Sequence, residues 1–132
     1  MIYWSKVKEG AIIPTKRKED AGYDIYPCFD EDYMIIGEHQ TVMVPTGIAT
    51  AFSEQFAMIL KERGSTGTKG IAQRCGVIDS GFRGEYMVPI TNAGKQVIII
   101  AKEEWRKLKP LAEAIEYTRS LFLIRDNPRE AL

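Results

Sequence analysis

The segment from Cys75 to Glu85 holds the residue types best suited to chemistry. It reads Cys-Gly-Val-Ile-Asp-Ser-Gly-Phe-Arg-Gly-Glu, a short apolar strand that enters a turn at Asp79, with Phe82 three positions later. A carboxylate held at a turn can orient and deprotonate a water molecule as a general base. The ring of Phe82 offers a flat surface for a sugar or a base. The alternatives are that Asp79 only bonds its own backbone, as turn aspartates often do, and that Phe82 belongs to the core.

Glycines, hydroxyl groups and two cations are concentrated in residues 62–70, which read Glu-Arg-Gly-Ser-Thr-Gly-Thr-Lys-Gly. Gly-rich backbone can turn its N–H groups toward an anion, and the hydroxyls of Ser65 and Thr66 add donors. Arg63 can bind two phosphate oxygens at once. The order Thr-Lys-Gly differs from the Gly-Lys-Ser/Thr of a P-loop. The segment is therefore either a phosphate-binding loop built on Arg63 and Gly64 or a flexible hairpin loop.

A third candidate is Asp24, within the sequence Ala21-Gly22-Tyr23-Asp24-Ile25. The two small residues allow another backbone to approach closely. On a strand, Asp24 points to the face opposite Tyr23 and Ile25. Its carboxylate could hold the water shell of a metal ion, or it could be an ordinary solvated strand acid.

The composition predicts a single globular domain over residues 1–132, because 45% of the residues are hydrophobic and 27% are charged. The 18 basic and 18 acidic residues balance, which argues against nucleic acid as a partner. The longest apolar run, 97–101, is far too short to span a membrane. Cys28 and Cys75 lack metal-ligand spacing, so a reduced pair is favoured over a disulfide. With no signal peptide in view, we expect a cytoplasmic protein with His39 at the surface.

Short apolar segments punctuated by Gly and Pro predict an all-β domain. The predicted strands are 2–4, 22–26, 33–36, 41–44, 47–52, 56–61, 71–73, 77–78, 85–91 and 97–100. Residues 53–55 are predicted to join two of them as a hairpin, and residues 92–95 form a turn. Apolar residues at helical steps indicate an amphipathic helix over 102–116, which Pro110 shortens to about 103–109. A last strand is predicted over 117–125.

The three segments, in this order, resemble the motifs of the trimeric deoxyuridine triphosphatase (dUTPase) family. Ala-Gly-Tyr-Asp at 21–24 is similar to its first motif, 63–70 to its second and 76–85 to its third. The resemblance covers about residues 20–100. It implies a jelly-roll-like β barrel of the dUTPase type with one short helix, assembled as a homotrimer whose active sites lie between subunits.

The resemblance also implies a reaction, the hydrolysis of dUTP to dUMP and pyrophosphate with Mg²⁺. Asp79 would activate the water that attacks the α-phosphorus, and Asp24 would hold the water shell of the metal ion. Phe82 stands where the family usually has Tyr, and its ring would pack under the deoxyribose. The implied substrate-binding residues are Arg63, Gly64, Ser65, Thr66, Gln73, Gly76, Val77, Ile78, Phe82 and Arg83. Much of the uracil recognition would come from the backbone of a hairpin near 74–78.

Some features depart from the family pattern. Gly64 replaces a common serine, and the strand at 117–124, compared with the fourth motif, lacks its Gln. The Gly- and Arg-rich fifth motif is not found in these 132 residues. A weak or inactive nucleotide-binding or regulatory protein is therefore an alternative. A dCTP deaminase-like enzyme is another, because residues 78–82 also resemble that branch, and a purely structural β module is a third.

Overall fold

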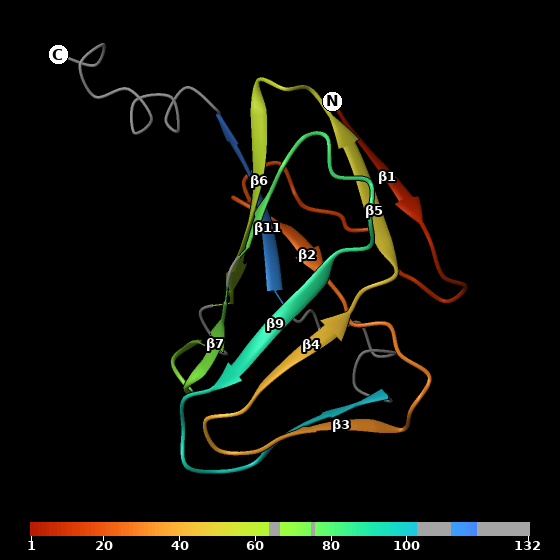
Figure 1. Cartoon of the computed structure of the whole chain (residues 1–132). Coiled ribbons are helices and arrows are strands. Elements are labelled where there is room, and N and C mark those ends of the chain that lie inside the picture. Colours follow the sequence, from red (N-terminus) through yellow and green to blue (C-terminus); the bar gives the residue numbers. More distant parts are fainter. Residues whose placement is uncertain (64–66, 75, 103–111, 119–132) are drawn as a thin grey trace, which may run out of the picture.

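The protein is built of short β-strands that pack around one core (Figure 1). The structure is a computed structural model that describes residues 1–63, 67–74, 76–102 and 112–118. The strands are β1 Ile2–Lys6, β2 Tyr23–Ile25, β3 Tyr33–Ile36, β4 Thr41–Pro45, β5 Ile48–Phe52, β6 Phe56–Glu62, β7 Ile71–Gln73, β8 Val77–Ile78, β9 Met87–Asn92, β10 Ile98–Ala101 and β11 Ala112–Thr118. The predicted strands coincide with β1 to β10, with ends that differ by one or two residues. The all-β prediction is therefore confirmed.

The strands pair antiparallel in four small sheets, ordered β1-β5, β10-β3, β2-β11-β6-β8 and β4-β9-β7. Strands that follow one another in the sequence lie in different sheets, which is typical of a jelly roll. The pairings among the described residues do not close into one continuous barrel. The fold is thus jelly-roll-like, with the sheets enclosing a shared core.

The predicted hairpin through residues 53–55 is wrong. A turn does form there, with the amide of Phe56 donating to the carbonyl of Ser53 at 3.0 Å. However, β5 pairs with β1, while β6 pairs with β11 and β8. Both edges of β6 are occupied by strands distant in sequence, so the short connection cannot fold β5 back onto it.

The prediction of a helix extending over 102–116 is wrong for its second half, because β11 begins at Ala112. Ala112 and Ala114 are fully buried and the intervening Glu113 is half-exposed, which is the two-residue alternation of a strand. β11 lies between β2 and β6 and is hydrogen-bonded to both. The last strand therefore begins five residues earlier than predicted. The predicted helix at 103–109 and residues 119–125 lie outside the described residues.

The core consists of buried side chains from most of the strands and from the segments that join them. The largest fully buried side chains are Tyr86, Ile25, Ile36, Ile48, Met58, Leu60, Ile90, Val44, Val88, Asn92 and Thr46. Full burial of one such aliphatic side chain contributes about 1.5–3 kcal/mol. The buried amide of Asn92 is satisfied, because it donates to the carbonyls of Ile36 at 3.0 Å and Gln96 at 2.7 Å. This core fixes the strands whose ends carry the candidate site.

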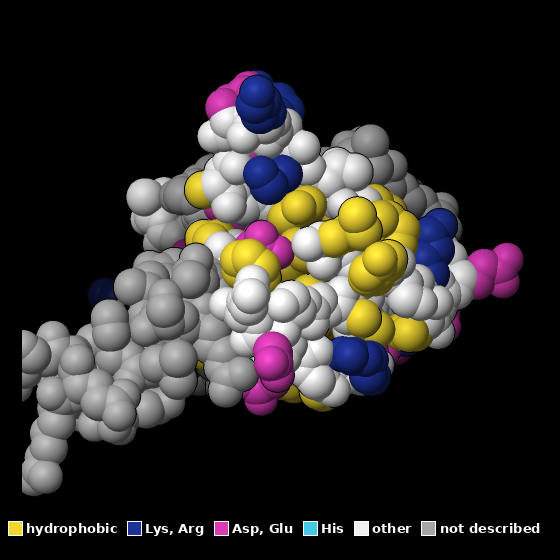
Figure 2. Space-filling model, turned by 90° about the horizontal axis from the view of Figure 1, so that it is seen from above, with side chains coloured by type: hydrophobic (Ala, Val, Ile, Leu, Met, Phe, Trp, Pro, Cys, Tyr) yellow, Lys and Arg dark blue, Asp and Glu magenta, His cyan; other side chains and the backbone are white. Residues whose placement is uncertain are grey.

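Figure 2 shows hydrophobic side chains gathered on the end of the molecule that carries the N-terminus and the turn between β5 and β6, with single charges of both signs around them. A second set of exposed apolar residues lies on the paired strands β3 and β10, where Tyr33, Ile35 and Ile99 are 56%, 50% and 59% exposed. Within the described residues, there is no helix long and apolar enough to cross a membrane. His39 is exposed, as predicted, and its ring lies 3.4 Å from Glu38.

Candidate functional site

The first and second motifs meet beside β11. Ala112 of β11 pairs with Ile25 of β2 on one side and with Glu62 of β6 on the other. Asp24 and Arg63, the neighbours of those two residues, are thereby brought to the same region. Tyr26 lies within electrostatic range of both residues. Burial raises the pKa of Tyr26 above its ordinary value, the charge of Asp24 raises it further, and the charge of Arg63 lowers it. A carboxylate and a guanidinium thus share one neighbourhood, as a phosphate-binding site would need.

A second carboxylate lies directly across from Asp24. The register pairs Asp24 with Glu113, and a Cβ placed on Gly22 would lie 3.1 Å from the Cβ of Glu113. The expected close approach at Gly22 is therefore confirmed, with β11 as the approaching strand. Like charges directly opposite one another are destabilising, and a cation between them would relieve this repulsion.

Two carboxylates, such as those of Asp24 and Glu113, are the kind of group that can hold a magnesium ion through water. Mg²⁺ usually keeps several waters and uses one or two carboxylates together with substrate phosphates. Across the described parts of the chain, no group of three or more His, Cys, Asp or Glu residues could hold a metal ion. Two carboxylates would suit an ion that arrives with its phosphates. Gly64, Ser65 and Thr66, predicted to bind phosphate, lie outside the described residues.

Asp79 follows β8 and begins a tight turn in which the amide of Phe82 donates to the Asp79 carbonyl at 3.1 Å. The Asp79 side chain is exposed, and it has no hydrogen-bond or ion-pair partner within the described residues. The turn is thus closed by backbone and leaves the carboxylate available. This arrangement suits a group that must accept a proton from water.

Arg83 anchors the same turn. One terminal nitrogen of its guanidinium, Nη1, donates to the carbonyls of Ser80 and Phe82 within the turn and of Thr50 on β5, the last at 3.4 Å. The Thr50 hydroxyl is in turn hydrogen-bonded to the buried hydroxyl of Tyr86. The predicted substrate-binding residue Arg83 therefore also connects the turn to the core.

Gln73 and Gly76 form a compact corner before β8. The backbone of Gly76 has φ +111°, a left-handed conformation that favours glycine. A Cβ at this position would lie 2.7 Å from the carbonyl oxygen of Leu60 and 3.1 Å from the Gln73 side chain. The side-chain amide of Gln73 also donates to the carbonyl of Arg74. The corner is thus packed against β6, and Cys75 within it lies outside the described residues.

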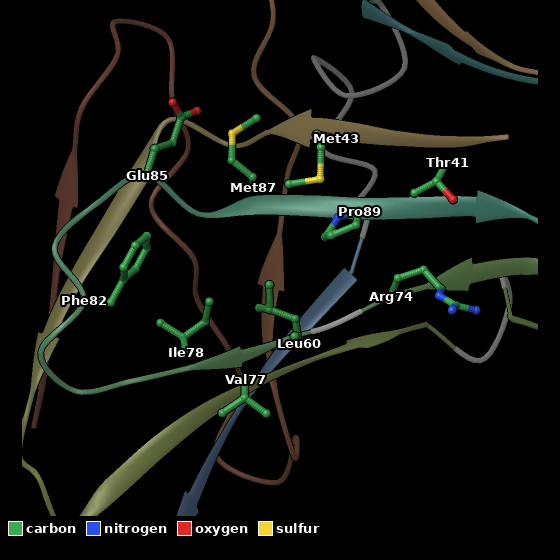
Figure 3. A pocket seen from close by; sticks show the side chains of 11 residues that line it. Thr41, Met43, Leu60, Arg74, Val77, Ile78, Phe82, Glu85, Met87 and Pro89 are labelled. Atoms are coloured by element: carbon green, nitrogen blue, oxygen red, sulfur yellow. The ribbon is translucent and has the colours of Figure 1, made fainter.

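This corner and the turn after it form one wall of a cavity of about 500 Å³. Its lining residues are Thr41, Met43, Leu60, Arg74, Gly76, Val77, Ile78, Phe82, Glu85, Met87 and Pro89. Figure 3 shows Phe82 and Glu85 at one end, Arg74 and Thr41 at the other, and apolar side chains between them. The volume and the largely apolar lining are those of a small-molecule site.

The structure unites four of the predicted substrate-binding residues, Gly76, Val77, Ile78 and Phe82, in this cavity. Gln73 supports it from behind, and Arg83 supports the turn that carries Phe82. The sequence predicted Arg74 only as part of the hairpin near 74–78, and its side chain was not among the predicted substrate-binding residues. The opposite wall from β4 and β9 was missed. The residues that β4 and β9 contribute carried no signal, because exposed Met and buried Pro also occur in ordinary sheets.

The two halves of the site are separated within one chain. Asp24 lies on β2 and Asp79 follows β8, and these strands form opposite edges of the sheet β2-β11-β6-β8. Three inter-strand spacings put the two edges about 14 Å apart. A single chain therefore holds Asp24 and Asp79 apart.

Comparisons with known proteins agree on the family that this fold represents. The family model for dUTPase matches residues 8–105. The deoxyuridine 5'-triphosphate nucleotidohydrolase of Leptospira interrogans is 34% identical over 103 residues, which cover 75% of this chain and 70% of the relative.

Solved structures give the same architecture. A mutant dUTPase from phage phi11 of Staphylococcus aureus, described as coordinating a structural Mg(II) ion, superposes with a TM-score of 0.77 at 18% identity, covering 89% of this chain and 90% of the other. The native EIAV dUTPase superposes with a TM-score of 0.73 at 25% identity, covering 89% and 88%. The molecule is therefore an all-β, jelly-roll-like protein with a cavity of about 500 Å³. More particularly, the chain belongs to the dUTPase family.

Proposed function

We propose that this protein hydrolyses dUTP to dUMP and pyrophosphate. The observation that carries the proposal is the position of Asp79, whose exposed carboxylate stands between two residues of the cavity lining, Ile78 and Phe82. A nucleoside in this cavity would leave its phosphates at the turn, within the range of a base that can activate water. The named activity of the Leptospira relative supports the same assignment.

In this mechanism the chain supplies a base, an aromatic support and groups that hold the phosphates. Asp79 accepts the proton of the water that attacks the α-phosphorus, and Phe82 packs under the deoxyribose. Arg63, with Gly64, Ser65 and Thr66, binds the triphosphate oxygens. When bound, Mg²⁺ would neutralise phosphate charge, and Asp24 and Glu113 would accept hydrogen bonds from its water shell. Gln73 and the backbone near Gly76 and Val77 face the base, while Arg83 keeps the turn in place and contributes positive charge beside the substrate.

A complete site requires a homotrimer in this proposal. The separation of Asp24 from Asp79 within one chain supports a site shared by neighbouring subunits. Exposed apolar side chains on β3 and β10 also support self-association, because soluble monomers rarely expose contiguous apolar patches. We further propose that the enzyme acts in the cytoplasm.

The test is pyrophosphate release from each deoxynucleoside triphosphate, with and without Mg²⁺. We expect release from dUTP only, and only with the metal ion. Asp79→Asn should keep dUTP binding by calorimetry but reduce turnover by about 100-fold or more, the usual contribution of a general base. Asp32→Asn, at an exposed acid outside the site, is the matched control and should retain full turnover.

Other outcomes would point elsewhere. Binding of dUTP without pyrophosphate release would identify a nucleotide-binding protein, and ammonia release from dCTP would identify a deaminase. Normal turnover by Asp79→Asn would show that the base has been misassigned.

A further inference from the structure

Among the residues that the structure describes, Arg74 is the polar residue of the cavity lining whose side chain has no bonding partner. The other polar side chains in the lining are Thr41 and Glu85. The Thr41 hydroxyl is hydrogen-bonded to Thr91 at 2.6 Å. The Glu85 carboxylate accepts a hydrogen bond from the Gly47 amide at 2.9 Å and pairs with Lys8 at 3.0 Å.

The guanidinium of Arg74, by contrast, has no hydrogen-bond or ion-pair partner in the parts of the chain that the structure describes. Its backbone is nevertheless fixed on both sides. The Arg74 amide donates to the carbonyl of Pro89 at 2.9 Å, and the Arg74 carbonyl accepts from the Gln73 side chain. A cation with five N–H donors is therefore carried on a well-anchored backbone at the edge of an apolar cavity.

The position of Arg74 limits what those donors can meet. Figure 3 shows Arg74 at the end of the cavity opposite Phe82, with Ile78, Leu60, Met87 and Pro89 between them and the exposed guanidinium directed outward from these side chains. A sugar over the Phe82 ring would direct its base along this apolar stretch toward Arg74. The phosphates would leave from the other end, where Asp79 follows Ile78.

We propose that Arg74 is a specificity-determining residue that donates hydrogen bonds to the carbonyl edge of the base. This inference rests on the proposed function. A guanidinium can only donate, and uracil presents carbonyl oxygens as acceptors. Cytosine presents an amino group at the equivalent ring position, which is itself a donor. Arg74 therefore favours uracil and opposes cytosine.

The experiment uses Arg74→Met, which keeps the length of the side chain and removes every donor. The probes are deoxyuridine, which has no phosphate, in a binding assay, and dUTP and dCTP in steady-state kinetics. Lys95→Met is the matched control, because Lys95 is exposed and outside the cavity. We expect Arg74→Met to weaken deoxyuridine binding about tenfold and to lower the dUTP-to-dCTP ratio of kcat/KM by a similar factor, as for a lost base contact. The Lys95→Met variant should match the wild type in both assays.

Two results would overturn the inference while leaving dUTP hydrolysis intact. In one, Arg74→Met binds deoxyuridine like the wild type and loses affinity only for dUTP, while Arg74→Lys restores that affinity; the residue would then be a phosphate contact. In the other, the preference for dUTP over dCTP does not change. If the wild type neither binds deoxyuridine nor hydrolyses dUTP, the proposed function fails, and the role of Arg74 fails with it.

Discussion

Replacing Gly76 by alanine should damage both stability and the cavity. The substitution adds a Cβ 2.7 Å from the backbone carbonyl of Leu60, a separation that real Cβ atoms do not tolerate. It also places a side chain on a residue with φ +111°. The neighbouring atom is backbone, so the strain cannot be relieved by rotating a flexible side chain.

The magnitude can be estimated from two contributions. Holding a non-glycine residue in such a backbone conformation costs about 1–3 kcal/mol. Moving the corner away from β6 also weakens the 2.7 Å hydrogen bond from the Leu60 amide to the Gly76 carbonyl, worth about 1 kcal/mol. Gly76→Ala should therefore lower the free energy of unfolding by about 2–4 kcal/mol.

The assay is urea denaturation together with deoxyuridine binding, and Gly81→Ala is the control. Gly81 lies in the same segment, but a Cβ there meets nothing within 4 Å. Gly81→Ala should unfold within about 0.5 kcal/mol of the wild type, as surface substitutions usually do. If Gly76→Ala matched Gly81→Ala in both stability and binding, the reasoning about this corner would be refuted.

Two further predictions concern the residues around the turn. Gly84→Ala places a Cβ 2.7 Å from Cζ of Phe82. Because the Phe82 ring can move aside, the free energy of unfolding should change little, while the KM for dUTP should rise. An unchanged KM would show that the position of the ring does not matter. Burial raises the pKa of Tyr86 to about 12, whereas an unfolded tyrosine titrates near pH 10. This contribution to stability is therefore complete below about pH 10 and is lost as the pH rises toward 12. The unfolding free energy of the wild type should fall more steeply over that pH range than that of Tyr86→Phe. Equal slopes would contradict the raised pKa of Tyr86. Tyr33→Phe, at an exposed ring, is the control and should behave like the wild type.

The strands could be predicted because their signals are local. In β6, Met58 and Leu60 alternate with more exposed residues, and turn residues bound most of the other segments. Such a pattern depends only on a strand having one buried face. It does not depend on which strand lies alongside.

The choice of partners could not be predicted in the same way. Residues 53–55 have the composition of a hairpin turn, yet β5 and β6 join different sheets. At β11, the helical spacing that includes Ile115 competed with the alternation of Ala112, Glu113 and Ala114. The segment forms a strand because its backbone is hydrogen-bonded to β2 on one side and to β6 on the other.

In the candidate site, too, some features could be predicted from the sequence and others depended on the tertiary structure. Residue type and order alone indicated an acid at Asp79, a ring at Phe82 and a cation at Arg63, because carboxylates, aromatic rings and guanidinium groups carry their chemistry in any fold. Packing was needed to set Glu113 opposite Asp24, to give the cavity a wall from β4 and β9, and to leave Arg74 at its far end. Those relations depend on hydrogen-bond register and sheet contact between distant segments, and neither is encoded in the short-range pattern of side chains.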